Sequence, residues 1–491
     1  MINYIALSEL IKLKDNDEIS QDYIAYLCGF SRDHNYRHQE IIDISLLLEN
    51  FNNLEINDKK FLYGYSIPQL NKEFDLLIFA NEFCVNIELK STYLNIDKAK
   101  RQLIENQHYL KMIKEKIYSF TYYSTDNKLF ILDEKKELRD VSFECLENLL
   151  GGINEVQPNL DEYFLPRKIL VSPLNSPSEF LRGNYILTEN QRNIKEKIIN
   201  FILCNNDDYF YGLYGSAGTG KTLLIYDIVK ELSQSNKIIL VHSGMLCDGH
   251  DYLNSKIKNV NILKAKDLRY REIKDIDLLV VDESHRLYET ALDKIKRWSL
   301  KANKKCIFTY DEKQKMSYAE RRRNTMATIK TLCGINVSKL TNKIRTNKEI
   351  AMFITCLRDL SKYKKEYRFP NVKIVYEKNK NAAVKIAKQS ENQGYKYISY
   401  TASYYDSRLD YQQSNLNTHK VIGQEYDAVT MIMDNNFYYS DNILEGKIHP
   451  NPDYIFTQLL YQGLTRTREK LLLIITDLNL LQKILILFSN N

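Results

Sequence analysis

Apolar runs alternate with helical periods along most of the chain, and this pattern predicts an α/β protein. Up to about residue 165, strand-like runs at 74–80 and 83–89 lie among helical stretches, one of which covers 97–116. We interpret residues 1–165 as one compact α/β domain. Prolines then interrupt the periodic pattern, so we expect a linker at 166–185.

From near residue 186 onwards, short apolar runs alternate regularly with helical patterns. Such an alternation is typical of parallel sheets covered by helices. We expect two doubly wound sheets, one in a lobe at 186–335 and one in a lobe at 336–491. The strand-like runs that carry this prediction are 209–214, 237–242, 278–281, 306–310, 372–376, 397–400, 428–433 and 471–476.

Composition narrows the class of protein. With 491 residues and 44% hydrophobic content, the chain can bury several cores. No apolar run approaches a membrane span and the amino terminus mixes charges early, so we expect a cytoplasmic protein without a membrane partner. The scattered cysteines form no Cys-x-x-Cys pair and support neither a disulfide framework nor a zinc ribbon. The net charge of +6 permits a nucleic-acid partner without requiring one.

A glycine-rich loop directly after the run at 209–214 is the strongest chemical signal, and it has the Walker A pattern. In such a loop, backbone N–H groups surround phosphates, Lys221 reaches the β- and γ-phosphates, and Thr222 can hold Mg²⁺. A helical pattern follows at 223–229. The loop therefore predicts binding of ATP with Mg²⁺. Its residues are Gly215, Ser216, Ala217, Gly218, Thr219, Gly220, Lys221 and Thr222.

The apolar run at 278–281 ends in two carboxylates, as a Walker B element does. Asp282 would hold Mg²⁺ through water, and Glu283 would polarise the attacking water. The two motifs together predict ATP hydrolysis.

Further motifs follow along the chain at residues 187–191, 310–314, 340–346, 423–427 and 464–468. Their order resembles that of superfamily 1 helicases. In such motors ATP is hydrolysed in a cleft between two lobes, and the second lobe brings cations to the charge of the transition state. The resemblance implies two RecA-like lobes, with Gln191 reading the adenine base and Gln314 sensing the γ-phosphate. It also implies that Arg345 approaches the γ-phosphate and that Arg466 is the arginine finger. Glu425 would belong to the motif that couples nucleic-acid contact to the nucleotide.

Two departures from the superfamily 1 pattern matter. Tyr310 stands where the third motif usually has glycine, and residues 282–285 also fit the Asp-Glu-x-His signature of superfamily 2. Gln314 and the segment 464–466 favour superfamily 1. Because the motifs follow one another closely, no room remains for large inserted subdomains. ATP hydrolysis and translocation are therefore better supported than strand separation.

The first domain carries a second group of acids. A hairpin that turns at Asn81 and Glu82 pairs Asp75 directly with Glu88, and like charges so placed destabilise a sheet unless a cation lies between them. Period-two alternation puts Lys90 on the face of Glu88. Mg²⁺ or Mn²⁺ between the two acids, with Lys90 steering the attacking water or the phosphate, would form a phosphodiesterase site.

That arrangement resembles the PD-(D/E)xK nuclease family, although Phe74 replaces the proline of the name. The resemblance implies that Glu40, in the helical stretch 36–48, is an additional metal-coordinating acid. It also implies that Gln102 is the trailing glutamine of the family. Glu40 and Gln102 are equally compatible with exposed polar positions on helices, and Glu88 with Lys90 is compatible with a surface salt bridge.

A nuclease-like first domain joined to a compact superfamily 1 motor resembles bacterial Schlafen group 3-like helicase-domain proteins, some of which are antiviral nuclease-helicases. The resemblance implies an ATP-driven nuclease acting on nucleic acid, with DNA preferred. An ATP-gated nucleic-acid sensor that binds without cutting, and an RNA-directed enzyme with the same motor, stay open. The sequence also leaves homo-oligomerisation open.

Overall fold

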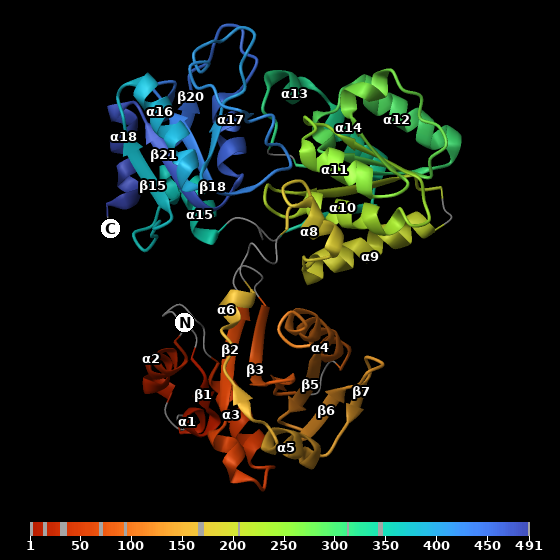
Figure 1. The fold of residues 1–491 in the computed structure, drawn as a ribbon, viewed down its shortest axis with the longest axis vertical. Helices are drawn as coiled ribbons and strands as arrows, with labels where there is room; N and C mark the ends of the chain where they lie inside the picture. The colour runs from red at the N-terminus through yellow and green to blue at the C-terminus, as the bar shows by residue number, and fades with distance from the viewer. Residues whose placement is uncertain are drawn as a thin grey trace. The chain divides into compact units, whose positions relative to one another are not determined.

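The computed structural model describes residues 3–12, 17–29, 37–67, 72–92, 96–164, 171–204, 207–311, 314–341 and 347–489. The chain divides into two compact units, unit 1 at Met1–Lys168 and unit 2 at Ile169–Asn491 (Figure 1). Both units are α/β, as the sequence predicts. In the described part of the chain, no helix has the length and apolar character needed to cross a bilayer.

Unit 1 is built on one mixed sheet of eight strands in the order β1-β2-β3-β4-β5-β6-β7, with β8 pairing β3. All neighbours are antiparallel except β4 and β5. The strands are β1 (Ile5–Ala6), β2 (Lys60–Ile67), β3 (Lys72–Ala80), β4 (Phe83–Lys90), β5 (Lys116–Tyr123), β6 (Lys128–Leu132), β7 (Leu138–Asp140) and β8 (Glu155–Val156). The helices are α1 (Leu7–Ile11), α2 (Asp17–Cys28), α3 (His38–Leu48), α4 (Ile96–Leu110), α5 (Phe143–Gly151) and α6 (Leu160–Tyr163).

The register of the β3–β4 hairpin confirms the predicted turn at Asn81 and Glu82. Leu76 pairs with Ile87 and Phe79 pairs with Cys84, so the next step along the ladder sets Asp75 opposite Glu88. The following helix is shorter than predicted. It ends at Leu110 because the chain must turn there to begin β5, which pairs in parallel with β4 from Lys116 onwards.

Unit 2 contains two parallel sheets, which confirms that expectation. The first has six strands in the order β11-β10-β12-β13-β9-β14. We call the part that carries it, residues 171–341, lobe 1. Its strands are β9 (Phe210–Gly215), β10 (Ile238–His242), β11 (Val260–Lys264), β12 (Leu278–Asp282), β13 (Lys305–Tyr310) and β14 (Val337–Leu340). Its helices are α8 (Pro177–Arg182), α9 (Glu189–Leu203), α10 (Lys221–Leu232), α11 (Asp248–Lys256), α12 (Glu289–Ala302), α13 (Tyr318–Arg322) and α14 (Thr325–Cys333).

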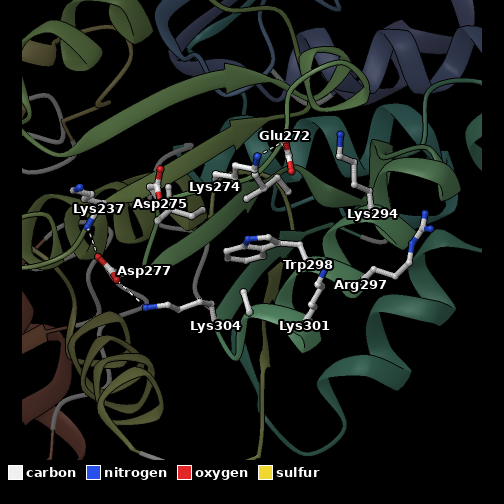
Figure 2. Close-up of a pocket in the computed structure, with 13 residues that line it drawn as sticks. Lys237, Glu272, Lys274, Asp275, Asp277, Lys294, Arg297, Trp298, Lys301 and Lys304 are labelled. Carbon is white, nitrogen blue, oxygen red and sulfur yellow. Dashed lines mark hydrogen bonds and ion pairs between the residues drawn. The ribbon is translucent and has the colours of Figure 1, made fainter.

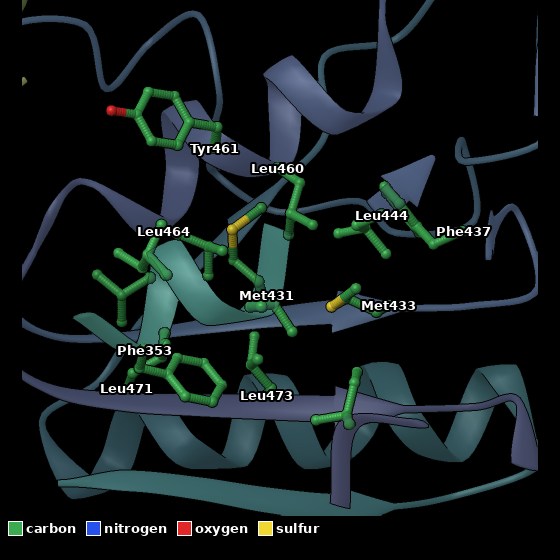
Figure 3. Close-up of a cluster of buried hydrophobic side chains, with 14 of the residues drawn as sticks. Phe353, Met431, Met433, Phe437, Leu444, Leu460, Tyr461, Leu464, Leu471 and Leu473 are labelled. Atoms are coloured by element: carbon green, nitrogen blue, oxygen red, sulfur yellow. The ribbon is translucent and has the colours of Figure 1, made fainter. Parts of the chain in front are cut away.

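The second parallel sheet has five strands in the order β15-β21-β18-β16-β17, and we call its part, residues 347–489, lobe 2. Met431 and Met433 of β18 pack with side chains of β21 and α17 in its core (Figure 3). The strands are β15 (Val372–Tyr376), β16 (Lys396–Ser399), β17 (Leu416–Asn417), β18 (Tyr426–Met433) and β21 (Thr467–Ile475), with a separate hairpin of β19 (Phe437–Ser440) and β20 (Ile443–Gly446). The helices are α15 (Lys348–Arg358), α16 (Lys380–Ser390), α17 (Phe456–Leu464) and α18 (Leu478–Leu485).

The segment expected as a linker, 166–185, contains the short helix α8. Pro177 occupies its first turn, where a missing backbone N–H does not weaken a helix, so this proline starts structure instead of interrupting it. Phe180 of α8 is fully buried in the core of lobe 1 and stacks on Tyr185. The described residues of this segment, 171–185, therefore pack as part of lobe 1.

Candidate functional site

The glycine-rich loop joins the carboxyl end of β9 to the first turn of α10. Gly218 and Gly220 have φ values of 77° and 85°, a left-handed conformation that favours glycine. A Cβ atom on Gly215 would lie 2.8 Å from the carbonyl oxygen of Leu340, so the neighbouring strand β14 leaves room only for glycine. The loop therefore has the conformation in which backbone N–H groups can surround an anion.

Lys221 is buried and folds back over this loop. Its ammonium donates hydrogen bonds to the carbonyl oxygens of Gly215 at 2.7 Å and Ser216 at 3.1 Å. It also lies 3.7 Å from a carboxylate oxygen of Asp311. Thr222, the next residue, is buried as well. A phosphate in the loop would offer Lys221 a charge-assisted partner stronger than the two carbonyls.

The Walker B acids lie at the carboxyl end of β12, beside the loop. Asp282 accepts a hydrogen bond from the hydroxyl of Thr309 on β13 and lies 3.5 Å from the ring of His242 on β10. Glu283 has a φ of 56°, and its backbone N–H donates to the same Thr309 hydroxyl at 3.1 Å. Left-handed backbone at a residue other than glycine is strained, and such strain clusters at functional sites.

Glu283 is buried yet stays ionised. Burial alone would raise its pKa, but His285, Arg286, Lys221 and Arg466 outweigh it and lower the pKa to about 2. The ring of His285 lies 3.5 Å and the guanidinium of Arg286 lies 3.7 Å from its carboxylate. Because Arg466 belongs to lobe 2, charges from both lobes act on this one carboxylate.

The two predicted nucleotide-sensing glutamines lie in different surroundings. Gln191 is buried and accepts the backbone N–H of Thr188 at 2.9 Å, which caps α9, while its amide nitrogen lies 3.5 Å from the carbonyl of Thr219. Its predicted contact with adenine stays a prediction. Gln314 is also buried, and within the described residues its side-chain oxygen has no hydrogen-bond partner. An unpaired buried acceptor of this kind is available to a bound water or ligand.

Tyr310, the departure from the usual glycine, has a packing explanation. Its ring stacks on Tyr214 of the neighbouring strand β9, with centroids 5.6 Å apart and planes 7° from parallel. Only 1% of Tyr310 is exposed, in the core between the sheet and α14. A glycine at this position would leave a cavity in that core.

Lobe 2 brings one of its two predicted arginines to the cleft. Arg466 is buried and donates hydrogen bonds to the carbonyl oxygens of Gln462 and Gln424, each at 3.2 Å. Arg345 lies outside the described residues, so its approach to the γ-phosphate stays a prediction. Glu425 forms an ion pair with Arg468 at 3.3 Å, and its backbone N–H donates to Asn175 of lobe 1 at 2.8 Å.

A cavity of about 380 Å³ opens beside the glycine-rich loop, where lobe 1 meets lobe 2. Ser216 and Ala217 line it from lobe 1, while Arg358 and Lys362 line it from lobe 2. The guanidinium of Arg358 lies 4.6 Å from the centre of the Tyr461 ring. No motif marks Arg358 in the sequence, because only the docking of α15 against the loop brings it to the cleft.

In unit 1, the predicted carboxylates meet across the β3–β4 hairpin. The ammonium of Lys90 lies 3.5 Å from Glu88 and 3.8 Å from Asp75. A carboxylate oxygen of Asp75 accepts the backbone N–H of Leu89 at 2.7 Å. Glu88 is 1% exposed, so this trio is not the surface salt bridge that the sequence left open.

Two helices carry the other predicted residues: Gln102 on α4 contacts Glu88, and Glu40 on α3 lies within electrostatic range of Asp75. The amide of Gln102 on α4 donates to one oxygen of Glu88, and Asn106, one turn later, donates to the other at 2.6 Å. Glu40 on α3 accepts the hydroxyl of Tyr63 at 3.0 Å. We call Glu40, Asp75, Glu88, Lys90, Gln102 and Asn106 the carboxylate cluster.

Glu88 and Glu40 of this cluster resist ionisation. Burial and then the charge of Asp75 raise the pKa of Glu88 to about 8, against the opposing effects of Lys90, Lys72 and Asn106. Burial and Asp75 likewise raise the pKa of Glu40 to about 7, against Tyr63 and Arg37. An added cation would relieve the mutual repulsion of these groups.

The carboxylates of this cluster are candidate ligands for a divalent ion. Across the described ranges, no group of three or more histidine, cysteine, aspartate or glutamate side chains is arranged to hold a metal. Mg²⁺ is nevertheless bound in many proteins by one or two carboxylates plus water and substrate phosphate. Asp75 and Glu88 offer two such carboxylates, and burial and the charge of Asp75 raise the pKa of Glu88, so the residues fit a divalent ion that keeps water ligands.

Sequence reasoning missed Tyr63, Asn106 and Arg358. Asn106 follows Gln102 by four positions, the spacing that puts two residues on one face of a helix, so this signal could have found it. Tyr63 could not be found in this way, because strand pairing from a distant part of the chain brings it to Glu40.

Comparison with known families places a helicase-like domain in unit 2. Residues 210–429 match the family model described as Schlafen group 3, DNA/RNA helicase domain. That range holds the glycine-rich loop, both Walker B acids and Glu425, but ends before Arg466. No curated protein matches the chain.

Solved helicase structures show only distant likeness. A Pif1 helicase from Bacteroides in complex with ADP-AlF3 and ssDNA has a TM-score of 0.33 and 15% identity, over 59% of this chain and 92% of that one. Pif1 helicase from Candida albicans has a TM-score of 0.32 and 12% sequence identity, over 62% of this chain and 100% of that one. S. cerevisiae Dbp5 bound to RNA and ADP BeF3 has a TM-score of 0.33 and 14% sequence identity, over 66% of this chain and 92% of that one. Likeness at this level does not extend to a shared activity.

Proposed function

We propose that the chain is an ATP-dependent nuclease and helicase or translocase that acts on nucleic acid, with DNA preferred. Unit 2 would hydrolyse ATP and move along a strand, and unit 1 would cut phosphodiester bonds with Mg²⁺ or Mn²⁺. The observation that carries the motor part is the glycine-rich loop of lobe 1 with its buried Lys221, beside a cavity that residues of lobe 2 also line. The match to a DNA/RNA helicase domain supports the nucleic-acid partner.

For ATP hydrolysis, each residue has one task. The loop N–H groups and Lys221 would hold the phosphates, while Thr222 and Asp282 would hold the Mg²⁺ that accompanies ATP. Glu283 is ionised and can accept a proton from the attacking water. Arg466, held by the carbonyls of Gln462 and Gln424, can stabilise negative charge on the transferred phosphoryl group. Movement of lobe 2 would therefore control hydrolysis in lobe 1.

For cleavage, Asp75 and Glu88 would hold the divalent ion, and Glu40, whose pKa burial and then the charge of Asp75 raise, would be the additional acid. The ion, when bound, supplies Lewis-acid polarisation of the phosphate and lowers the pKa of a water ligand. Gln102 and Asn106 fix the two oxygens of Glu88 in place. Once a divalent ion neutralises the two acids, Lys90 would be available to hold the scissile phosphate or to orient the water.

A second candidate is an ATP-gated nucleic-acid sensor whose unit 1 binds without cutting. The position of Lys90 favours it, because an ammonium 3.5 Å from Glu88 and 3.8 Å from Asp75 already supplies the cation that these acids need. Metal-dependent cleavage by the purified protein would exclude this candidate. An RNA-directed enzyme with the same motor is separated from the first proposal by its substrates alone.

One matrix of assays tests the proposal. Wild type, Lys221→Ala and Glu88→Ala are assayed against linear, circular and single-stranded DNA and against RNA, with and without ATP, in Mg²⁺ or Mn²⁺. We expect Lys221→Ala to abolish ATP hydrolysis and Glu88→Ala to abolish cleavage while ATP hydrolysis continues. Matched controls are Lys197→Ala on the exposed face of α9 and Glu82→Ala at the exposed hairpin turn. Cleavage by Glu88→Ala at the wild-type rate contradicts the nuclease assignment.

A role in antiviral defence rests on the family resemblance and needs its own test. Cells that carry the wild-type gene should resist infection by a susceptible phage. Cells that carry the Lys221→Ala or the Glu88→Ala gene at the same protein level should not. Equal plating of phage on all three strains would remove the defence role and leave the biochemical proposal standing.

A further inference from the structure

A large basic cavity lies in lobe 1, away from the ATP cleft. Its volume is about 740 Å³, within the range that holds small ligands. Its place follows from the sheet, because Lys237, Asp277 and Lys304 of its lining directly precede strands β10, β12 and β13. These strands are parallel, so the cavity is at their amino ends, whereas the glycine-rich loop follows the carboxyl end of β9. We call it the amino-edge cavity.

Helix α12 forms one wall of this cavity with a single face. Lys294, Arg297, Trp298 and Lys301 follow one another by three, one and three positions, which puts all four on the same side of a helix. All four line the cavity, and Figure 2 shows the indole of Trp298 among the other lining side chains. Trp298 is half-buried, so part of its ring packs on the core and part faces the cavity.

The charges of the lining favour an anion. Six cationic side chains and three carboxylates line the cavity. Two of the cations are already neutralised, since Lys304 pairs with Asp277 and Lys274 with Glu272, each at 2.8 Å. The remaining cationic lining residues are Lys237, Lys294, Arg297 and Lys301.

The cations of α12 differ in how they are held. Lys294 donates to the carbonyl oxygens of Leu268 at 2.6 Å and Arg271 at 2.7 Å, which ties the facing loop to the helix. Arg297 donates only to the carbonyl of Asp293, at 3.3 Å. Within the described part of the chain, neither Arg297 nor Lys301 has a carboxylate partner. Two uncompensated cations therefore flank an accessible indole face.

We propose that the amino-edge cavity binds a nucleotide unit, with its phosphate between Arg297 and Lys301 and its base against Trp298. Cationic side chains that track phosphates and aromatic rings that stack on bases are the two elements of sequence-tolerant single-strand binding. An adjoining cavity of about 410 Å³ shares the loop 272–276 and adds Arg271, which gives room for a strand to continue. We assign the nucleotide unit to a nucleic-acid strand. This assignment rests on the nucleic-acid partner of the proposed function and adds a second contact site for it, at the edge of the sheet opposite the ATP cleft.

The only tryptophan of the chain is Trp298, so intrinsic fluorescence of the full-length protein reports directly on this cavity. We titrate with a single-stranded oligothymidylate in one arm and with AMP in the other. Both arms use Lys221→Ala protein, in which the ATP site is impaired. We expect saturable quenching by the oligonucleotide that weakens as salt is raised.

The decisive variant is Arg297→Glu with Lys301→Glu, and its matched control is Lys296→Glu, an exposed lysine on another face of the same helix. The double change should raise the apparent Kd for the oligonucleotide by at least about tenfold, whereas the control should bind as the parent does. A second variant, Trp298→Ala, is followed by anisotropy of a labelled oligonucleotide and should weaken binding about fivefold or more.

Each outcome is informative. Quenching by AMP as well as by the oligonucleotide, lost in the double variant, keeps the nucleotide chemistry but assigns it to a free nucleotide. No quenching by either ligand, or quenching that the double variant leaves unchanged, overturns the proposal. Because these variants leave the ATP cleft and the carboxylate cluster intact, such a failure is separate from any failure of ATP hydrolysis or cleavage.

Discussion

Glu283 in lobe 1 and Glu88 in unit 1 are both buried glutamates at candidate catalytic positions, yet their protonation is opposite. The pKa of Glu283 is lowered to about 2, and that of Glu88 is raised to about 8. Burial opposes ionisation in both cases, so the neighbours make the difference. Cations from two lobes surround Glu283, whereas Glu88 faces Asp75 with Lys90 as its nearest counter-charge.

The difference shows what each centre lacks. In the proposed mechanism, the cleft between the lobes already holds a charged base, Glu283, and would need only the nucleotide and the correct position of lobe 2. The carboxylate cluster is a site with its acids in place but its charge suppressed, and a divalent cation would supply what is missing.

Removing the cation of lobe 2 should have the largest effect. Arg466→Ala should lower the kcat of ATP hydrolysis by about 10³-fold, because an arginine that stabilises transition-state charge contributes at least that much. Phosphate release at saturating ATP and nucleic acid measures it. The exposed Arg368→Ala in the same lobe is the control. A wild-type kcat in Arg466→Ala would show that this arginine does not stabilise the transition state of ATP hydrolysis.

Neutralising the charged base should have the next largest effect. Glu283→Gln keeps the size of the side chain but cannot accept a proton, so kcat should fall by about 10²-fold or more. Binding of a fluorescent ATP analogue should persist, since Lys221 and the loop are unchanged. Loss of nucleotide binding together with kcat would mean that Glu283 supports the fold of the cleft and not the chemistry.

Neutralising one acid of the carboxylate cluster should stabilise the metal-free protein and abolish its response to metal. Asp75→Asn removes the charge that repels Glu88, so the metal-free protein should gain about 1 kcal/mol of stability at pH 8. The same variant should lose both cleavage and stabilisation by Mn²⁺. Thermal unfolding with and without Mn²⁺ measures this, with Glu82→Gln as the control. A destabilised metal-free variant would contradict the repulsion between these acids.

The pH dependence of stability has a definite sign at this cluster. Glu88 and Glu40 have folded-state pKa values of about 8 and 7, above the ordinary value of 4.5, so the folded state keeps protons that the unfolded state releases. This contribution is full below pH 4.5 and is lost as the pH rises through 7 and 8. The Tm increase caused by Mn²⁺ should therefore be larger above pH 8 than below pH 6. An equal increase at both pH values would contradict the raised pKa values.

The sequence predicted most of what local patterns determine. The hairpin turn and the period of two set Asp75 opposite Glu88, and the eight apolar runs after residue 186 all became parallel strands. Strands β11 and β14 were missed because both are short and have polar residues at exposed positions. The positive φ of Glu283 was not predictable either, because the hydrogen bond to Thr309 on another strand fixes it.

Side chains that arrive through tertiary packing were beyond sequence reasoning. Tyr63 reaches Glu40 through strand pairing, and Arg358 reaches the glycine-rich loop through the docking of lobe 2. The same limit applies to charge. The sequence shows that Glu88 and Glu283 are glutamates. Only the surrounding structure shows that Glu88 keeps its proton and Glu283 does not.

The central contrast is tested most directly by counting the protons released when Mn²⁺ binds to the nucleotide-free protein. Calorimetric titration near pH 6.5, in buffers with different ionisation enthalpies, gives this count. Because Glu88 and Glu40 are largely protonated there, we predict the release of one to two protons in wild type. Asp75→Asn should neither bind Mn²⁺ nor release protons. Binding of Mn²⁺ to wild type without proton release would show that the cluster is already ionised and would contradict the account.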